Sequence, residues 1–571
     1  MKIMNIYLIG MVVTMILYVV VGALISRGVK NANDFYVAGR NAPAYLITGS
    51  LVASFIGVGL FMGDVGEAYS GFFGPLMVAV GTLSVGYIFG SVFFGRYLRR
   101  SQALTIPQFF GKRFDSKAMK MLATITGTFI MLVYSLSCVQ GIATLMSVVT
   151  GLAYNTCIIL SVIAFTLITV LSGAKGVLIT DTIMFAVFSV ATIVGAGVIA
   201  SKAGGWMNTV SELATYQPIP GLLAAGGNPS YFYPTAKENI IWAAGYGIAW
   251  MAVLAVAPWQ SSRYLMAKNE HAVVRSSIIA SVAVFVIEFL MCMAGVFTQK
   301  LNPGMEAPSQ ALIWASMNIM PTILGIIVLS GVLASGISSA TTFLSLISSN
   351  IMNDILNVRN ERRKVLYGRI AVLIVGVIIC LLCIYQPPQI FWITYLGATI
   401  VACSWLPVAI ASVWSKRVTK TGAFWGMLVG FVVSAVMKIG VSVAGVTLPI
   451  YFDPFFVGLA AGIVAMVIGS ALTKVTEAEI REREALFVVP DSEKNPEDIK
   501  KTKRLIALSI PMGVIVTTWK SPRRTARASS RRPLPYISYM RTTSHRRRCT
   551  VRQPTGSRPA SFLMWPNAWW K

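Results

Sequence analysis

The residues best able to do chemistry gather in one apolar stretch, from Leu329 to Ile355. The stretch is long enough to cross a bilayer, yet it is rich in hydroxyl side chains. These are Ser335, Ser338, Ser339, Thr341, Thr342, Ser345, Ser348 and Ser349. Hydrocarbon tolerates hydroxyls poorly unless they find partners. The pattern therefore predicts either tight helix packing or a polar ligand inside the protein, and a transported cation is the sharper of these two hypotheses.

A second stretch, AYLITGSLVASFIGVGLFMGDVGEAYSGFFG, is unusually rich in glycine. Interior glycine weakens a helix, and in membranes it is tolerated where helices approach closely or where unwound backbone lines a cavity. The sequence therefore allows close packing, or a helix broken near Ala53 to Gly59 whose free carbonyls coordinate a cation. Asp64 and Glu67 follow in the outer half of this span, where they can simply reach the outer interface.

Asp181 is a carboxylate a few residues into the sixth predicted span, counted from its cytoplasmic end. A charged side chain costs roughly 2.5–3.5 kcal/mol at the centre of a membrane helix and less near the interface. We therefore expect Asp181 to face an aqueous path or a partner. Pairing with Lys175, or a favourable place at the start of a helix, would also explain it.

Thirteen apolar spans are predicted to position these groups. The 571-residue chain is 56% hydrophobic and only 12% charged, which is typical of an all-α polytopic membrane protein and excludes water-soluble classes. The first run lacks the basic start and small-residue cleavage site of a signal peptide, so we expect a retained helix. The spans fall at about 4–26, 43–70, 75–98, 119–150, 156–173, 176–201, 239–262, 272–299, 320–350, 366–386, 390–414, 421–442 and 453–473.

The basic residues predict how these spans are oriented. Lys and Arg gather in the connections that follow odd-numbered spans, as with Arg99, Arg113, Arg263 and Lys268, and are nearly absent from the others. The positive-inside rule therefore places the N-terminus outside and the first connection in the cytoplasm. The long connection from 203 to 238 is then expected over the extracellular mouth.

The chain changes character after the last span. We expect residues 1–473 to form the transmembrane domain, 474–504 a polar cytoplasmic linker, and 505–518 a truncated apolar span. Residues 519–571 contain 11 Arg, two Lys and no acidic residue, so nearly half of the net charge of +27 lies there, and the charge does not indicate nucleic acid. This basic tail either binds anionic lipid or, as we prefer, derives from a frameshift or fusion, which resequencing the DNA around Thr518 would decide.

Several segments, in this order and spacing, resemble the sodium:solute symporter family, whose members include proline, pantothenate and sugar symporters. They are DFYVAGRNAPAYLITGSLVAS, ALTIPQFFGKRF, GAKGVLITDT, APWQSSRYLMAKNEHAVVRS and the serine-rich ninth span. The resemblance covers about residues 1–475. It implies a leucine-transporter-type fold, with inverted repeats at about 43–201 and 239–414 and with the second and seventh spans broken at the midplane.

The resemblance also implies a sodium site. Its ligands would be the backbone carbonyls of Ala53, Ile56 and Ser335 and the hydroxyls of Ser338 and Ser339. Five uncharged oxygens suit a hard cation that must also be released. Asp181 matches the family's acidic residue on the inward exit route of sodium. Phe55 departs from the aspartate of the proline symporters, which argues against a proline-like substrate.

The predicted substrate contacts are aromatic and amide side chains near the midplane. The fourth span offers Tyr134, Ser137 and Gln140, and the seventh offers Tyr246 and Trp250. Such a set suits a small polar organic solute, although Tyr and Trp are also common anchors at the membrane interface. Basic side chains that could clamp a carboxylate are not predicted at mid-span, although the N-terminus of a half-helix could bind one through its backbone amides. Amino acid, monocarboxylate, vitamin and sugar substrates all remain open.

These features predict a sodium-coupled symporter in the cell membrane that imports a small organic solute by alternating access. Its partners would be the sodium ion, the solute and the lipid bilayer, without a cofactor. A sensor that keeps the transporter fold would be expected to continue into a signalling domain. A proton-coupled carrier would need a titratable group at the midplane, and none lies beside Ser338 and Ser339 in sequence. An enzyme is disfavoured because no nucleophile–base set and no metal cluster is present.

Overall fold

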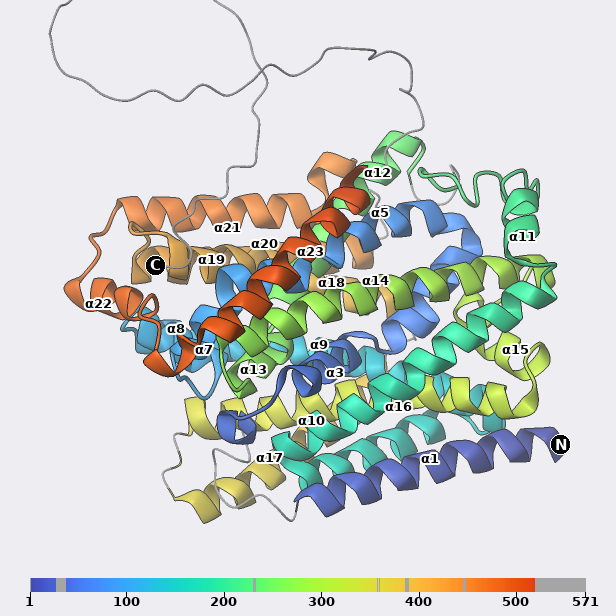
Figure 1. Cartoon of the computed structure of the whole chain (residues 1–571), viewed down its shortest axis with the longest axis horizontal. Coiled ribbons are helices and arrows are strands. Elements are labelled where there is room, and N and C mark those ends of the chain that lie inside the picture. The colour runs from blue at the N-terminus through green and yellow to red at the C-terminus, as the bar shows by residue number, and fades with distance from the viewer. Residues whose placement is uncertain are drawn as a thin grey trace, which may run out of the picture. The chain divides into compact units, whose positions relative to one another are not determined.

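The computed structural model describes residues 2–26, 37–228, 233–356, 358, 360–385, 390–444 and 448–518. The basic tail at 519–571, about which the sequence raised two hypotheses, lies outside the described residues. Within the described part every regular element is a helix, apart from one isolated bridge between Ala42 and Ala267. The predicted all-α class is therefore confirmed, and Figure 1 shows the helices stacked side by side.

Ten segments of the described chain are long and apolar enough to cross a membrane. Two shorter apolar helices, Ala44–Phe55 and Tyr154–Val170, accompany them. The ten segments are Gly59–Arg100, Lys117–Thr150, Gly176–Lys202, Ala236–Met266, Glu270–Leu301, Thr322–Ile355, Leu366–Tyr385, Ile390–Trp414, Lys420–Val441 and Pro454–Ala471.

The N-terminal third departs most from simple spans. Helix α1 (Lys2–Ser26) corresponds to the first predicted span, and α3 (Ala44–Phe55) begins the second. From Gly59 to Arg100 the chain alternates short α-helices with wide-turn π-helices, and Gly71 interrupts this run with a φ of +106°. The elements of the run are η2 (Gly59–Asp64), α4 (Val65–Glu67), η3 (Ala68–Phe72), α5 (Phe73–Leu83), α6 (Gly86–Gly90), η4 (Ser91–Gly95) and α7 (Arg96–Arg100).

Most of the remaining long helices overlap predicted spans, and shorter helices occur in the predicted connections between them. Helix α10 (Tyr154–Lys202) covers the fifth and sixth predicted spans together. The others are α8 (Ile106–Arg113), α9 (Lys117–Thr150), α11 (Trp206–Leu213), α12 (Ala236–Val256), α13 (Pro258–Met266), α14 (Glu270–Leu301), α15 (Ala311–Asn318), α16 (Thr322–Asn350), η6 (Ile351–Ile355), α17 (Glu361–Tyr385), α18 (Ile390–Ile400), η7 (Val401–Trp405), α19 (Leu406–Trp414), α20 (Lys420–Ala444), α21 (Pro454–Ala471), α22 (Glu477–Ala485) and α23 (Pro496–Thr518).

The seventh predicted span is broken. Helix α12 ends at Val256, Ala257 is extended with a ψ of 143°, and Pro258 starts α13. Proline suits the first position of a helix because it lacks the N–H that would be unpaired there, but it cannot continue an existing helix without loss of a hydrogen bond. The discontinuity therefore follows from the local sequence.

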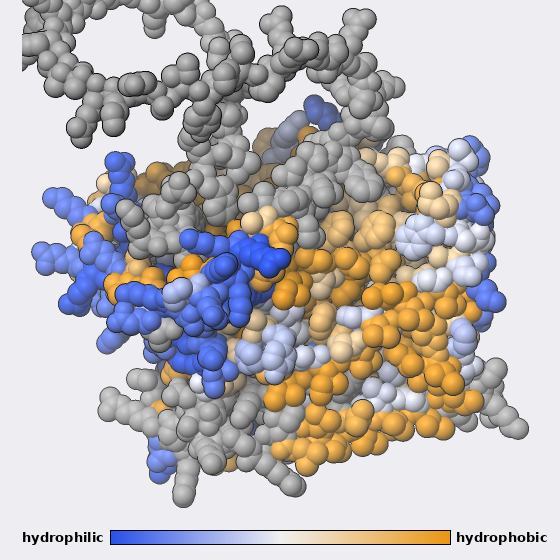
Figure 2. All heavy atoms as spheres, in the orientation of Figure 1, coloured by the Kyte–Doolittle hydropathy of each residue, from blue (hydrophilic) through white to orange (hydrophobic). Residues whose placement is uncertain are grey.

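The surface is consistent with a lipid environment. Figure 2 shows a broad hydrophobic face, with hydrophilic side chains gathered toward the end that carries α22 and α23. Large apolar side chains such as Leu373, Ile374 and Val377 on α17 are at least half exposed. Water would disfavour such a surface, whereas hydrocarbon matches it.

The polar segment after the last span is helical and contacts helices α7 and α8. Helix α22 begins with a capping box between Thr476 and Glu479, and Arg113 on α8 donates to the carbonyl of Glu479 at 3.1 Å. Arg100 donates to the carbonyl of Leu486 at 3.0 Å. The predicted apolar run at 505–518 belongs to α23, which already begins within the predicted linker.

Close helix packing makes Gly90 a sensitive position. A Cβ on Gly90 would lie 2.7 Å from the carbonyl oxygen of Ala255 on α12, whereas a Cβ on Gly197 in α10 would meet nothing within 4 Å. We expect Gly90→Ala to lower the free energy of unfolding by about 1–3 kcal/mol. Gly197→Ala should be neutral or slightly stabilising, because alanine favours helix over glycine. Thermal denaturation of the two purified variants measures this difference, and equal midpoints would contradict it.

Candidate functional site

The interrupted second span forms one wall of the site. Helix α3 ends at Phe55, Ile56 has a non-helical ψ of 86°, and helix resumes only at Gly59. The predicted break near Ala53 to Gly59 is therefore confirmed. Carbonyls in the last turn of a helix lack partners in their own helix, and this turn includes Ala53. Both Ala53 and Ile56 are fully buried.

The serine-rich helix α16 packs directly against this break. The Ser339 hydroxyl oxygen lies 3.3 Å from the position that a Cβ of Gly57 would occupy. A Cβ on Gly336 would lie 2.7 Å from a methyl group of Val58. Small residues on both sides thus allow the two backbones to approach. The structure brings the hydroxyl of Ser339 to the break, as the sodium-site hypothesis requires.

The other two serines of the predicted site are also buried. Ser335 donates its hydroxyl to the carbonyl of Val332 at 2.8 Å, so its side chain is occupied within the helix. Ser338 donates its hydroxyl to Oδ1 of Asp181 at 2.5 Å. A hydroxyl that donates its proton still has lone pairs with which to bind a cation. Asp181 therefore fixes the orientation of Ser338.

Asp181 belongs to a buried polar network. Ser50 on α3 donates to its Oδ2 at 2.6 Å, and Arg263 Nη2 lies 3.2 Å from the same oxygen. Arg263 also donates to the hydroxyls of Ser50 and Thr342, each at 3.0 Å. Asp181 and Arg263 are 1% and 2% exposed, so the network joins α3, α10, α13 and α16 away from water.

This network corrects one expectation from the sequence. Arg263 was counted among the charges of a cytoplasmic connection, but it is buried and paired with Asp181. The other suggested partner of Asp181, the side chain of Lys175, lies outside the described residues. The two members of the pair are 82 positions apart, so nothing local in the sequence indicated it.

Two small cavities lead away from the network. One is lined by Ser50, Arg263, Thr342, Ser345 and Ser349 among others. The next shares Ser262, Leu346 and Ser349 with it and extends to Thr105 and Asn350. Several hydroxyls of α16 that the sequence left without a ligand role thus line a polar route.

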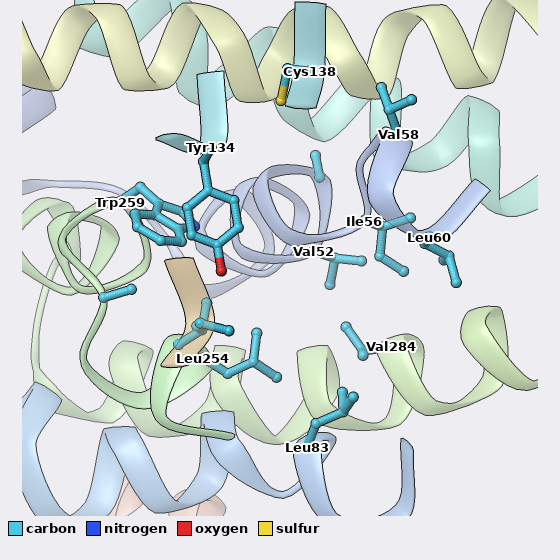
Figure 3. Packing of buried hydrophobic residues seen from close by; sticks show 14 of the residues in the cluster. Val52, Ile56, Val58, Leu60, Leu83, Tyr134, Cys138, Leu254, Trp259 and Val284 are labelled. Atoms are coloured by element: carbon cyan, nitrogen blue, oxygen red, sulfur yellow. The ribbon is translucent and has the colours of Figure 1, made fainter. Parts of the chain in front are cut away.

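A larger cavity lies beside the break. Its lining includes Phe55, Tyr134, Ser137, Trp250 and Ser339. Figure 3 shows Tyr134 next to Trp259 at the left of the view, with Ile56, Val58 and Leu60 of the interrupted helix at the right. The Tyr134 and Trp259 ring centroids are 4.6 Å apart. The structure therefore groups Tyr134, Ser137 and Trp250, all predicted substrate contacts, around one cavity.

Two other predicted contacts do not line this cavity. Gln140 is fully buried on α9, outside the lining. Tyr246 packs in an aromatic cluster, with ring centroids 4.9 Å from Trp242 and 5.5 Å from Phe391. Its hydroxyl donates to Oδ1 of Asp64 at 3.2 Å. Tyr246 is therefore linked to the cavity only by its hydrogen bond to Asp64, and Asp64 lines the cavity.

Two acidic residues of the cavity were missed or given little weight. Asp64 was expected to reach the outer interface, and Glu288 on α14 was not considered at all. Both line the same cavity as Ser339. A lone carboxylate in the middle of an apolar span is itself a sign of function, so the sequence held a usable signal at Glu288. No His, Asp or Glu lies beside the serine pair in sequence, but the fold brings these two carboxylates to the cavity that Ser339 lines.

Comparisons with known proteins agree with this geometry. The family model described as "Sodium:solute symporter family" matches residues 35–430. The sodium/pantothenate symporter of Escherichia coli is 24% identical over 464 residues, covering 78% of this chain and 92% of that protein. The sodium/proline symporter of Escherichia coli is 24% identical, with 75% and 88% covered. Sodium/glucose cotransporter 1 of Oryctolagus cuniculus is 26% identical, with 72% and 68% covered.

Two solved structures share the fold. A sodium-coupled sialic acid symporter, in a substrate-bound outward-open state, superposes with a TM-score of 0.69 at 17% identity, covering 83% of this chain and 99% of that one. A nucleobase-cation-symport-1 family transporter with bound bromovinylhydantoin gives 0.55 at 13% identity, covering 80% and 99%. The family model matches more than half of this chain, and the chain therefore belongs to the sodium:solute symporter family.

Proposed function

We propose that this protein imports a small organic solute by alternating access, driven by sodium that moves inward with it. Its family membership makes it a sodium-coupled solute symporter rather than an enzyme. The observation that carries the mechanism is the meeting of Ser339 with the break in α3, beside a cavity lined by aromatic residues.

The proposed sodium ligands are the carbonyls of Ala53, Ile56 and Ser335 and the hydroxyls of Ser338 and Ser339. The break supplies backbone carbonyls that need partners, and α16 supplies the hydroxyls. All five residues are buried, so the ion would exchange its water for protein oxygens. Because none of these ligands is charged, the ion would be held without being trapped.

Asp181 is proposed to mark the inward exit of sodium. It holds Ser338 on one side, and its partners Ser50 and Arg263 line the adjoining polar cavity. An ion that leaves Ser338 would therefore meet a carboxylate next. The hydroxyls of Thr342, Ser345 and Ser349 could then replace its ligands in turn.

Aromatic layers on two sides of the large cavity support alternating access. Tyr246 stacks between Trp242 and Phe391 near Asp64. Trp259 contacts both Tyr134 and Phe343, at centroid distances of 4.6 Å and 5.2 Å. We propose that these two layers close the cavity alternately. Tyr134 and Trp250 then contact the substrate, Tyr246 acts through Asp64, and Gln140 shapes the wall from behind.

We propose thirteen crossings in the cell membrane with the N-terminus outside. The run from Gly59 to Arg100 has 42 residues, or about 63 Å of helix, roughly twice the hydrocarbon thickness, so it would divide at Gly71. Helix α1 and Tyr154–Val170 complete the count. In Figure 1 the N-terminus and α11 lie at one end of the bundle, and α8 and α22 at the other, which supports the orientation from the basic residues.

The proposed leucine-transporter-type inverted repeats span about 43–201 and 239–414. Each would begin with a discontinuous helix, and the breaks after α3 and after α12 support this. Residues 1–473 would form the transporter domain and 474–504 a cytoplasmic segment. In the proposed organisation, residues 505–518 are a truncated span and residues 519–571 are an added basic tail.

Two other functions were considered from the sequence. A sensor with this fold is not favoured, since the relatives named above are transporters. Asp64 and Glu288 in the cavity are titratable groups of the kind that a proton-coupled carrier would need. The family match nevertheless favours sodium.

A thermal-shift screen tests the proposed function. Purified protein would be heated in sodium or potassium chloride with amino acids, carboxylates, sugars, vitamins and amines. A ligand that binds only the folded state raises the melting temperature. We expect stabilisation by one solute class in sodium and none in potassium. Equal stabilisation in both salts would contradict sodium coupling.

A further inference from the structure

The large cavity is lined by two acidic side chains. Asp64 comes from η2, directly after the break, and Glu288 from α14. Helix α14 approaches this region closely, since a Cβ on Gly295 would lie 2.5 Å from the carbonyl oxygen of Val65. Both carboxylates line the cavity together with Ser339.

The two carboxylates lack a basic partner. Glu288 is 1% exposed, and its Oε2 has no hydrogen-bond partner among the described residues. Asp64 accepts a hydrogen bond from the Tyr246 hydroxyl at 3.2 Å. No Lys or Arg occurs in the described lining of the cavity, and Arg263 is occupied by Asp181 elsewhere. Isolated buried charges are costly, so ionised carboxylates at these two positions would need a cation to balance their charge.

The rest of the lining also suits a cation. Phe55, Tyr134, Trp250, Trp259 and Phe343 surround the cavity with aromatic faces. Such faces attract ammonium and guanidinium groups through their quadrupoles. The Tyr134 hydroxyl has no partner among the described residues, so it could accept a hydrogen bond from an N–H donor. A solute carboxylate would find no basic side chain in this lining.

We propose that the transported solute is a small organic cation whose ammonium or guanidinium group binds between Asp64 and Glu288. This inference rests on the proposed sodium-coupled function and specifies its substrate class. Sodium held by its uncharged ligands beside Ser339, which also lines the cavity, and one monovalent organic cation would together balance the charge of the two carboxylates. Neither cation alone would do so, which gives a physical reason for the two to bind together.

Matched solutes test the proposal on the unaltered protein. We would measure thermal shifts and proteoliposome uptake of choline and methylguanidine. The control is the carbon analogue of choline, in which carbon replaces the charged nitrogen. Glucose, glycine betaine and pyruvate represent neutral, zwitterionic and anionic solutes. The cations should bind in sodium at least about tenfold more tightly than the carbon analogue.

Variants then test the carboxylates. Glu288→Gln keeps the shape but removes the charge, so uptake of the cationic solute should fall at least about tenfold, while sodium alone should still stabilise the protein. Asp64→Asn should act in the same direction, and provides a second test if Glu288→Gln does not fold. Glu306→Gln removes an exposed charge outside the spans, and should match the unaltered protein.

The possible failures can be told apart. Sodium-driven uptake of a neutral, zwitterionic or anionic solute, without response to any cation, would overturn this proposal and leave the proposed function standing. An unchanged cation response in both Glu288→Gln and Asp64→Asn would also overturn it. Absence of any sodium effect on stability or uptake would contradict both the organic-cation proposal and the proposed sodium-coupled function.

Discussion

Sodium-driven uptake is expected to disappear when Ser338 and Ser339 are both replaced by alanine. The change removes two of the five proposed oxygen ligands, each worth about 1.5–3 kcal/mol to a charged partner. Sodium affinity should therefore fall by about 10²- to 10⁴-fold. Uptake of solute into proteoliposomes under an inward sodium gradient measures the effect.

Ser330→Ala provides the control for this double variant. Ser330 lies on the same helix but accepts a hydrogen bond from Thr14 at 3.2 Å, away from the break. Its replacement should leave sodium dependence close to that of the unaltered protein. If the double variant retained the sodium dependence of Ser330→Ala, the assignment of Ser338 and Ser339 would be wrong.

The second large effect concerns Arg263. Arg263→Met would leave Asp181 as a buried charge held only by the hydroxyls of Ser50 and Ser338. Removing one member of a buried ion pair costs about 3–5 kcal/mol, whereas replacing both members is often nearly neutral. Arg263→Met should therefore destabilise strongly, and the Asp181→Asn, Arg263→Met double variant should recover most of the loss.

Thermal denaturation of the purified variants measures these stabilities. Arg275→Met serves as a comparison, because its ion pair with Asp498 at 2.8 Å is partly exposed and should contribute only about 0–1 kcal/mol. If the single and double variants at Asp181 and Arg263 lost the same stability, charge compensation would not be the role of Arg263.

The helical class and the break in the second span could be predicted from sequence, because both follow from local composition. Apolar runs of bilayer length specify spans, and glycines at Gly57 and Gly59 favour a local interruption. Tyr134 and Trp250 could be named because aromatic side chains near mid-span suit contact with a small polar organic solute. The resemblance implied that Ser339 faces the break in the second span, and the structure places Ser339 beside Gly57 in that break.

Contacts between distant residues could not be predicted from local patterns. Arg263 looked like a loop charge because it follows an apolar run, but the break at Ala257 lets α13 carry it back among the helices. Asp64 and Glu288 are separated by more than 200 positions in the chain, so only the fold shows that they share a cavity. Glu288 taken by itself could be seen in the sequence as a carboxylate within an apolar span.

The most direct test of the account is solute accumulation in proteoliposomes under opposed ion gradients. The solute would be the one identified by the thermal-shift screen. We predict accumulation above the outside concentration with an inward sodium gradient, and none with potassium or proton gradients of equal size. Accumulation driven equally well by a proton gradient in the absence of sodium would contradict the central claim that sodium is the coupling ion.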